Sequence, residues 1–142
     1  PRCAEAYQNK ISGPLLDRIY LHVDVDAVNP WEMNSVDNEP RETSAQIRER
    51  VVAARDRQLQ RQGMVNAHLD GKELEQHVIL NDELTQFLNG AAEKMGMSAR
   101  GYNRIKRLAR TIADLRGSDD IEMADLAEAL SYRPINRGKY GV

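Results

Sequence analysis

The sequence has very little cysteine and few aromatic residues. Of its 142 residues, one is cysteine, one is tryptophan and one is phenylalanine, and aromatic residues make up 5% of the chain. The lone cysteine, Cys3, excludes a disulfide within the chain. Strand-rich domains usually use more aromatic and β-branched residues. With 41% hydrophobic residues, the composition therefore predicts a small aliphatic core that is built from helices.

Long hydrophobic runs and an excess of one charge are also absent. No run approaches the roughly 18 apolar residues that a membrane span requires, and the sequence shows no signal peptide. We therefore expect a cytoplasmic protein with no membrane partner. The 20 Lys and Arg and 22 Asp and Glu leave a net charge of -2. Nucleic acid could be bound only through a local basic surface, because the chain has no overall positive field.

The sequence lacks the motifs of a self-sufficient enzyme. It has no glycine-rich loop followed by Lys-Ser or Lys-Thr and no nucleophile elbow. Its three histidines, His22, His68 and His77, lie far apart, and none has a cysteine or histidine at the spacing of metal ligands. We expect no metal site, and the chain alone should not hydrolyse ATP.

The first 42 residues differ in pattern from the rest. The chain begins with Pro1, and an apolar segment follows almost at once, which suggests a fragment of a larger protein. Residues 21–26 alternate apolar and polar side chains, which predicts one strand with a buried face formed by Leu21, Val23 and Val25. No second strand follows, so this orphan strand would pair outside the chain or be disordered. The polar, proline-containing residues 29–42 predict a flexible linker.

The remaining residues carry the start and stop signals of helices. Thr43 and Gln46 match a capping box that opens a helix running to about Gln62, with Gly63 as its terminator. Further signals predict a short helix over 71–78 and longer ones over 82–95, 98–117 and 122–132. The first helix should bury Ile47, Val51, Ala54 and Leu59. Four substantial helices with short connections predict an antiparallel bundle over 43–134, followed by a tail, 135–142.

Two arginines stand out as candidates for nucleotide sensing. Arg100 falls in the first turn of the helix that begins after Ser98, where a cation opposes the helix dipole. It is either an ordinary solvated arginine or one that reaches a neighbouring anion. Arg18 lies in apolar surroundings and either pairs with Asp17 or projects from an edge. In the second case it could act as an arginine finger, which supplies charge to phosphoryl transfer in an adjacent subunit.

Three more arginines follow Arg100 along the same predicted helix. Arg104, Arg107 and Arg110 recur at helical spacing, so they form either a solvated face or a ridge that faces an anion. The second reading supports an alternative function. In that alternative, the chain is a free-standing helical module that binds DNA or an acidic protein through this basic ridge.

Several ordered blocks resemble one family. They are ISGPLLDRI (11–19), SAQIRERV (44–51), SAR (98–100), ARTIADL (109–115) and LAEALSYR (126–133). Together they closely resemble the C-terminal part of bacterial magnesium-chelatase-like AAA+ ATPases of the ComM (YifB) type. The resemblance implies a parent protein that is a hexameric ATPase using ATP and Mg. Members of the ComM type are DNA branch-migration helicases of natural transformation, or competence, so DNA and identical ring subunits are the implied partners.

The resemblance also implies roles for the two arginines. Arg18 falls in the arginine-finger motif, a catalytic role at the ATP of the adjacent subunit. Arg100 takes the sensor-2 position, which binds the nucleotide of its own subunit. Residues 1–28 would be the C-terminal end of the AAA+ core, expected to be disordered in isolation, residues 29–42 the linker, and residues 43–134 the helical lid. The phosphate-binding loop and magnesium-binding acids would lie upstream.

The chain departs from the family pattern at two places. The family usually has aspartate where this chain has Tyr20, so a charge near the proposed finger is missing. Cys3 stands near a segment that is often cysteine-rich, but its partners are absent, which leaves a metal role without support. His77 also occupies a position where cysteine is common, and we assign it no function.

Overall fold

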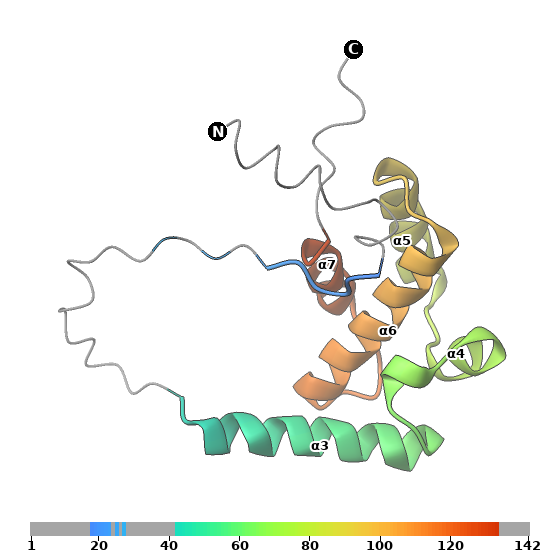
Figure 1. Ribbon diagram of the computed structural model, residues 1–142. Helices are drawn as coiled ribbons and strands as arrows, with labels where there is room; N and C mark the ends of the chain where they lie inside the picture. Colours follow the sequence, from blue (N-terminus) through green and yellow to red (C-terminus); the bar gives the residue numbers. More distant parts are fainter. Residues whose placement is uncertain (1–17, 24, 26, 28–41, 134–142) are drawn as a thin grey trace.

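A computed structural model describes residues 18–23, 25, 27 and 42–133, and all of its regular elements are helical (Figure 1). The elements are α3 (Ser44–Gln62), the 3-10 helix η2 (Asn66–His68), α4 (Gly71–His77), α5 (Asp82–Lys94), α6 (Ala99–Arg116) and α7 (Met123–Ser131). The all-α class is therefore confirmed for the part of the chain that the structure describes. None of these helices is long and apolar enough to cross a membrane. Cys3, all of the expected linker except Glu42, and the tail lie outside the described residues.

The helix ends follow the signals in the sequence. At the start of α3 the Gln46 amide donates to Thr43 Oγ1 at 3.3 Å, and the Thr43 amide donates back to Gln46 Oε1 at 2.8 Å. This reciprocal pair is the predicted capping box. The helix ends at Gly63, whose φ of 73° lies in the left-handed region that glycine adopts without strain.

The two helices that follow the short α4 are capped in the predicted way. Asn81 Oδ1 accepts a hydrogen bond from the Leu84 amide at 2.8 Å at the start of α5. Ser98 Oγ accepts one from the Gly101 amide at 3.1 Å at the start of α6. These side chains satisfy amides that have no partner within the helix. The predicted boundaries of α5 and α6 are therefore confirmed to within a residue or two.

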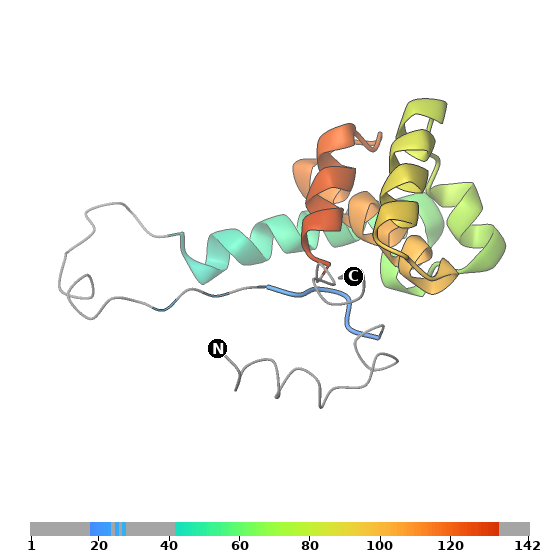
Figure 2. The ribbon, with the colours of Figure 1, turned by 90° about the horizontal axis from the view of Figure 1, so that it is seen from above.

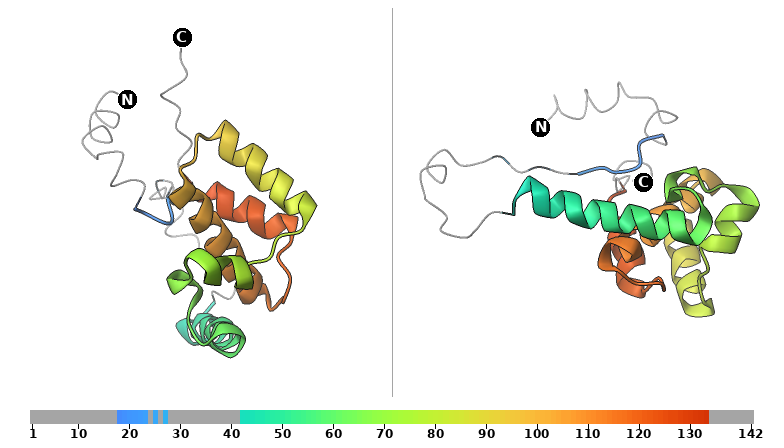
Figure 3. Two further views of the ribbon diagram at one scale, coloured as in Figure 1. Left: turned by 90° about the vertical axis from the view of Figure 1, so that its right-hand side faces the viewer. Right: turned by 90° about the horizontal axis from the view of Figure 1, so that it is seen from below.

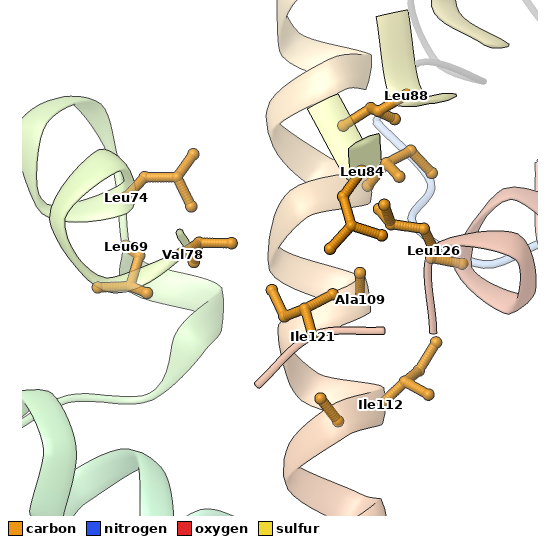
Figure 4. Packing of buried hydrophobic residues seen from close by; sticks show 12 residues of the cluster. Leu69, Leu74, Val78, Leu84, Leu88, Ala109, Ile112, Ile121 and Leu126 are labelled. Carbon is orange, nitrogen blue, oxygen red and sulfur yellow. The ribbon is translucent and has the colours of Figure 1, made fainter. Parts of the chain in front are cut away.

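The core surrounds α6. This helix packs against α3, η2 and α7, and α5 packs against α7. Buried side chains from α5, α6, α7, the connection between α6 and α7, and residues 69–78 form one cluster (Figure 4). Its members are Leu69, Leu74, Val78, Leu84, Leu88, Ile105, Ala109, Ile112, Ala113, Ile121, Leu126 and Ala129. The long helix that begins beside Arg100 is thus the element on which the others assemble.

The position of α3 differs from that expected in a simple bundle. Figures 1 and 3 show α3 lying across the C-terminal end of α6, while α5 and α7 lie side by side in Figure 2. The antiparallel bundle is therefore not confirmed as such. Of the stripe expected to be buried on α3, only Ala54 is buried, and Val51 is 52% exposed. The expectation for Ile47, Val51 and Leu59 is wrong. Ile47 and Val51 lie nearer the N-terminus of α3 than the buried Ala54 and Gln58, and Leu59 is 40% exposed because it follows Gln58 and points to a different side of the helix.

The expected orphan strand is not present in its described residues. Residues 19–23 and 25 are irregular, and Leu21, Val23 and Val25 are exposed, with Val25 at 86%. No described segment runs beside them as a strand, so their backbone has no ladder to join. Instead the His22 amide donates to the carbonyl oxygen of Tyr132 at 2.8 Å, which ties this segment to the end of α7.

Candidate functional site

Arg100 projects from the first turn of α6 and is exposed. No hydrogen bond or ion pair holds its guanidinium within residues 42–133. The first turn of α6 contains no acidic residue that could complement the amide groups of the helix N-terminus. A cation at this end of a helix is locally unfavourable. The position therefore leaves the Arg100 guanidinium available to an anion.

A second arginine, which the sequence reading did not single out, lies at the same end of α6. The guanidinium of Arg133 packs against Gly101 so closely that a Cβ at position 101 would overlap Arg133 Nη1. Gly101 is buried, in contrast to its neighbour Arg100. A glycine in the first turn of an otherwise strong helix was the signal that could have pointed to such a close approach.

Arg18 is described, exposed, and lies two residues before Tyr20. Asp17, its candidate partner in a local ion pair, lies outside the described residues. The structure therefore places the two predicted site residues on different segments, Arg18 before the helical unit and Arg100 on α6.

Tyr20 connects these two segments. Its hydroxyl oxygen accepts a hydrogen bond from Arg107 Nη1 at 2.6 Å. The Cζ atom of Arg104 lies 4.5 Å from the centroid of its ring, which is cation–π geometry. Sequence reasoning noted Tyr20 only as a departure from the family pattern. The structure shows that its ring and its hydroxyl both contact arginines of α6.

The basic ridge on α6 is not the solvated face that helical spacing predicted. The Arg110 side chain is 3% exposed, and its Nη2 lies 3.1 Å from Asp114 Oδ1. Arg110 also donates to the carbonyl oxygens of Ser118 and Asp119, after the end of α6. The Arg107 side chain is 13% exposed and lies 3.4 Å from Asp70. The solvated-face prediction is wrong for these two arginines, because α6 has neighbours on several sides.

Asp114 is the centre of a buried polar cluster that joins three elements. It accepts hydrogen bonds from Arg61 on α3 at 2.7 and 3.0 Å, from Asn66 Nδ2 on η2 at 2.8 Å, and from Arg110 Nε at 3.2 Å. Burial lowers the pKa of Arg110 below its usual value, while the neighbouring Asp114 carboxylate acts in the opposite direction. This cluster fixes α3 against α6, and its role is structural.

The described residues contain no group of three or more His, Cys, Asp or Glu side chains that could hold a metal ion. Among them, Arg100 is the predicted site residue best placed to meet an anionic group, because it is exposed and unpaired. Arg18 is exposed as well, and the segment that carries it contacts the helices through Tyr20 and His22.

Comparison with known proteins gives two family matches. Residues 41–133 match the family described as magnesium chelatase, subunit ChlI C-terminal. Residues 1–33 match the family described as magnesium chelatase, subunit ChlI. The first match coincides closely with the helical unit that runs from α3 to α7.

Individual relatives agree with these families. The chain is 42% identical over 137 residues to competence protein ComM of Haemophilus influenzae, covering 96% of this chain and 27% of that protein. It is 41% identical over 131 residues to YifB of Escherichia coli, covering 92% of this chain and 26% of that protein. A Mycobacterium tuberculosis protein, Rv2897c, is 33% identical over 139 residues, covering 92% and 27%. The chain therefore spans about a quarter of the length of these relatives.

Proposed function

Because the chain belongs to the magnesium chelatase ChlI C-terminal family, we propose that it is the helical lid of an ATP-driven AAA+ motor. In this proposal Arg100 senses the nucleotide of its own subunit, and Arg18 acts as an arginine finger at the adjacent, identical subunit of a ring. The parent protein is a DNA branch-migration helicase of the ComM type. The phosphate-binding loop and the acids that hold Mg belong to the remainder of the parent.

One observation carries the lid assignment. Arg100 stands exposed at the N-terminal end of the central helix, and the described residues give it no partner. Its guanidinium carries several donors in a planar array that suits phosphate oxygens. The amide groups at the start of a helix add to the attraction for an anion. The residues present therefore fit a terminal phosphate, although stability alone would favour an acid at this position.

The packing of α6 suggests how a contact at Arg100 would move the lid. When bound, ATP supplies a terminal phosphate whose position and charge change on hydrolysis. Arg100 would donate charge-assisted hydrogen bonds to that phosphate and would lose them after turnover. Because α6 packs against α3, η2 and α7, a shift of α6 carries these elements with it. A local change in charge is thereby converted into a movement of the helical unit against the core.

The full-length protein provides the test of both arginine roles. Arg100→Ala removes a charge-assisted contact, so we expect ATP turnover to fall roughly tenfold to a hundredfold. Arg18→Ala removes a finger and should lower turnover about a thousandfold or more. Arg55→Ala is the matched control, because Arg55 is an exposed arginine of α3 and should leave turnover unchanged. Wild-type turnover in both the Arg100 and Arg18 variants would overturn the proposal.

A further inference from the structure

Two arginines of α6, Arg104 and Arg107, contact the side chain of Tyr20, which lies in the same segment as Arg18. Arg104 stacks over the Tyr20 ring at 4.5 Å, and Arg107 Nη1 donates to the Tyr20 hydroxyl oxygen at 2.6 Å. Two residues further along, the His22 amide donates to the Tyr132 carbonyl oxygen at 2.8 Å. Side-chain and backbone contacts thus attach the same short segment to α6 and to the end of α7.

On α6, the Arg107 guanidinium has few other polar partners besides the Tyr20 hydroxyl. Arg107 Nε is buried and has no hydrogen-bond partner among the described residues. Its remaining polar contacts are the Tyr20 hydroxyl at 2.6 Å and the exposed Asp70 carboxylate at a longer 3.4 Å. The Tyr20 hydroxyl is therefore the better placed acceptor for this largely enclosed guanidinium. A phenylalanine at position 20 would keep the stacking on Arg104 but leave Arg107 without that acceptor.

The contact also lies in line with Arg100. Positions 100, 104 and 107 are four and three residues apart, so they lie along one face of α6. Tyr20 therefore packs on the same face as Arg100, beginning one turn further along the helix. Arg18 is two residues from Tyr20 in the other direction. A short path, Arg18 to Tyr20 to Arg104 to Arg100, therefore joins the two arginines.

We infer that Tyr20 is a positioning residue that fixes the segment of Arg18 to α6, so that one unit carries both arginines. The inference rests on the proposed function for the roles of Arg18 and Arg100, but the attachment itself does not. In a ring, Arg100 faces the nucleotide of its own subunit and Arg18 that of the neighbour. A shift of α6 at one site would then move the finger at the next site, which couples turnover between subunits.

The attachment is tested first in the 142-residue chain. Tyr20→Ala should expose the His22 amide, so its hydrogen exchange measured by NMR becomes at least about tenfold faster. Tyr20→Phe should give an intermediate change, because it keeps the ring over Arg104. Tyr102→Phe is the matched control: its hydroxyl donates to Asn89 at 2.9 Å within the helical unit, and its removal should leave His22 unchanged. Unprotected exchange at His22 in the wild-type chain would overturn the inference.

The positioning role is tested in the full-length protein. Tyr20→Ala should lower kcat for ATP on the order of tenfold to a hundredfold, because the finger loses its placement. The KM for ATP should stay unchanged, since Arg100 is intact, and the dependence of rate on ATP concentration should become less cooperative. Tyr20→Phe should recover part of kcat. The positioning role would be overturned if Tyr20→Ala left kcat for ATP unchanged while Arg18→Ala lowered it.

The two proposals fail in different ways. Wild-type turnover in both Arg18→Ala and Arg100→Ala would remove the nucleotide-sensing function but leave the exchange result at His22 standing. Loss of turnover in these variants, with no effect of Tyr20→Ala on exchange or on kcat, would leave the sensing function standing and remove the attachment.

Discussion

The Asp114 side chain is 0% exposed and holds the C-terminal half of α6 against α3. Its carboxylate accepts hydrogen bonds from Arg61, Asn66 and Arg110. Arg110 is itself buried, so loss of its acidic partner leaves an uncompensated charge in the interior. Removing one member of a buried ion pair costs about 3–5 kcal/mol, which is a large part of the 5–15 kcal/mol stability that is typical of a domain.

We therefore predict that Asp114→Ala lowers the free energy of unfolding by about 3–5 kcal/mol in urea denaturation followed by circular dichroism. Asp119→Ala is the matched control, because Asp119 is also paired with an arginine, Arg57, but its side chain is 97% exposed. That change should stay within about 0.5 kcal/mol. Asp114→Asn should fall between the two, since it keeps one acceptor oxygen. Equal effects of the two alanine variants would contradict the structural role of Asp114.

Sequence reasoning could not have found this cluster. Arg61 and Asp114 are 53 residues apart, and their charges look like those of any solvated helix face. Arg110 was predicted to lie on such a face. Only the packing of α3 and η2 against α6 encloses it, and periodicity within one helix cannot report that neighbour. Arg100 could be singled out as a candidate from the sequence because its signal is local: a cation in the first turn of a capped helix.

Two helical glycines, Gly90 inside α5 and Gly101 in the first turn of α6, test how closely Arg133 approaches α6. An alanine is favoured over glycine inside a helix by roughly 0.5–1 kcal/mol. Gly90 in α5 has nothing within 4 Å of a built Cβ, whereas Gly101 in α6 has the Arg133 guanidinium in that space. Gly90→Ala should therefore raise the unfolding free energy by about 0.5–1 kcal/mol.

Gly101→Ala should show little or none of this gain, because the new methyl group displaces Arg133. In an Arg133→Ala background the gain from Gly101→Ala should return, as thermal unfolding of the four variants would show. The account of this helix end would be wrong if Gly101→Ala stabilised the protein as much as Gly90→Ala in the wild-type background.

The helices themselves were predictable because their ends depend on short-range chemistry. Thr43 with Gln46, Asn81, and Ser98 supply the caps, and Gly63 and Gly117 adopt the left-handed conformation at the other ends. The buried face of α3 was not predictable in the same way. Its predicted stripe assumed a neighbour along the whole helix, but α6 meets only part of it. Gln58 is buried there instead, and its Oε1 atom accepts a hydrogen bond from the Asn66 backbone amide at 2.9 Å.

The molecule as a whole is organised around α6, which joins the hydrophobic cluster, the polar cluster at Asp114 and the exposed Arg100. A helix held on several sides moves only together with its neighbours. That property suits a sensor, because a contact that shifts one end of α6 also shifts every element packed on it. The attachment through Tyr20 would extend the same unit to the segment of Arg18.

The sequence supported the functional proposal through family resemblance more than through spacing. Local patterns left a basic ridge that binds DNA or an acidic protein only as an alternative, and the low exposure of Arg107 and Arg110 argues against it. The orphan strand was also suggested by a local pattern of alternation. Strand formation depends on a partner strand, which the described residues do not provide. The basic ridge and the strand were both predicted from a short sequence pattern, and a short pattern cannot specify which elements pack or pair beside it.

The most direct test is the structure of the full-length protein with a non-hydrolysable ATP analogue. The account predicts that a guanidinium nitrogen of Arg100 lies at hydrogen-bond distance, about 2.7–3.2 Å, from an oxygen of the terminal phosphate bound in the same subunit. An Arg100 side chain directed away from the nucleotide in every subunit would contradict it.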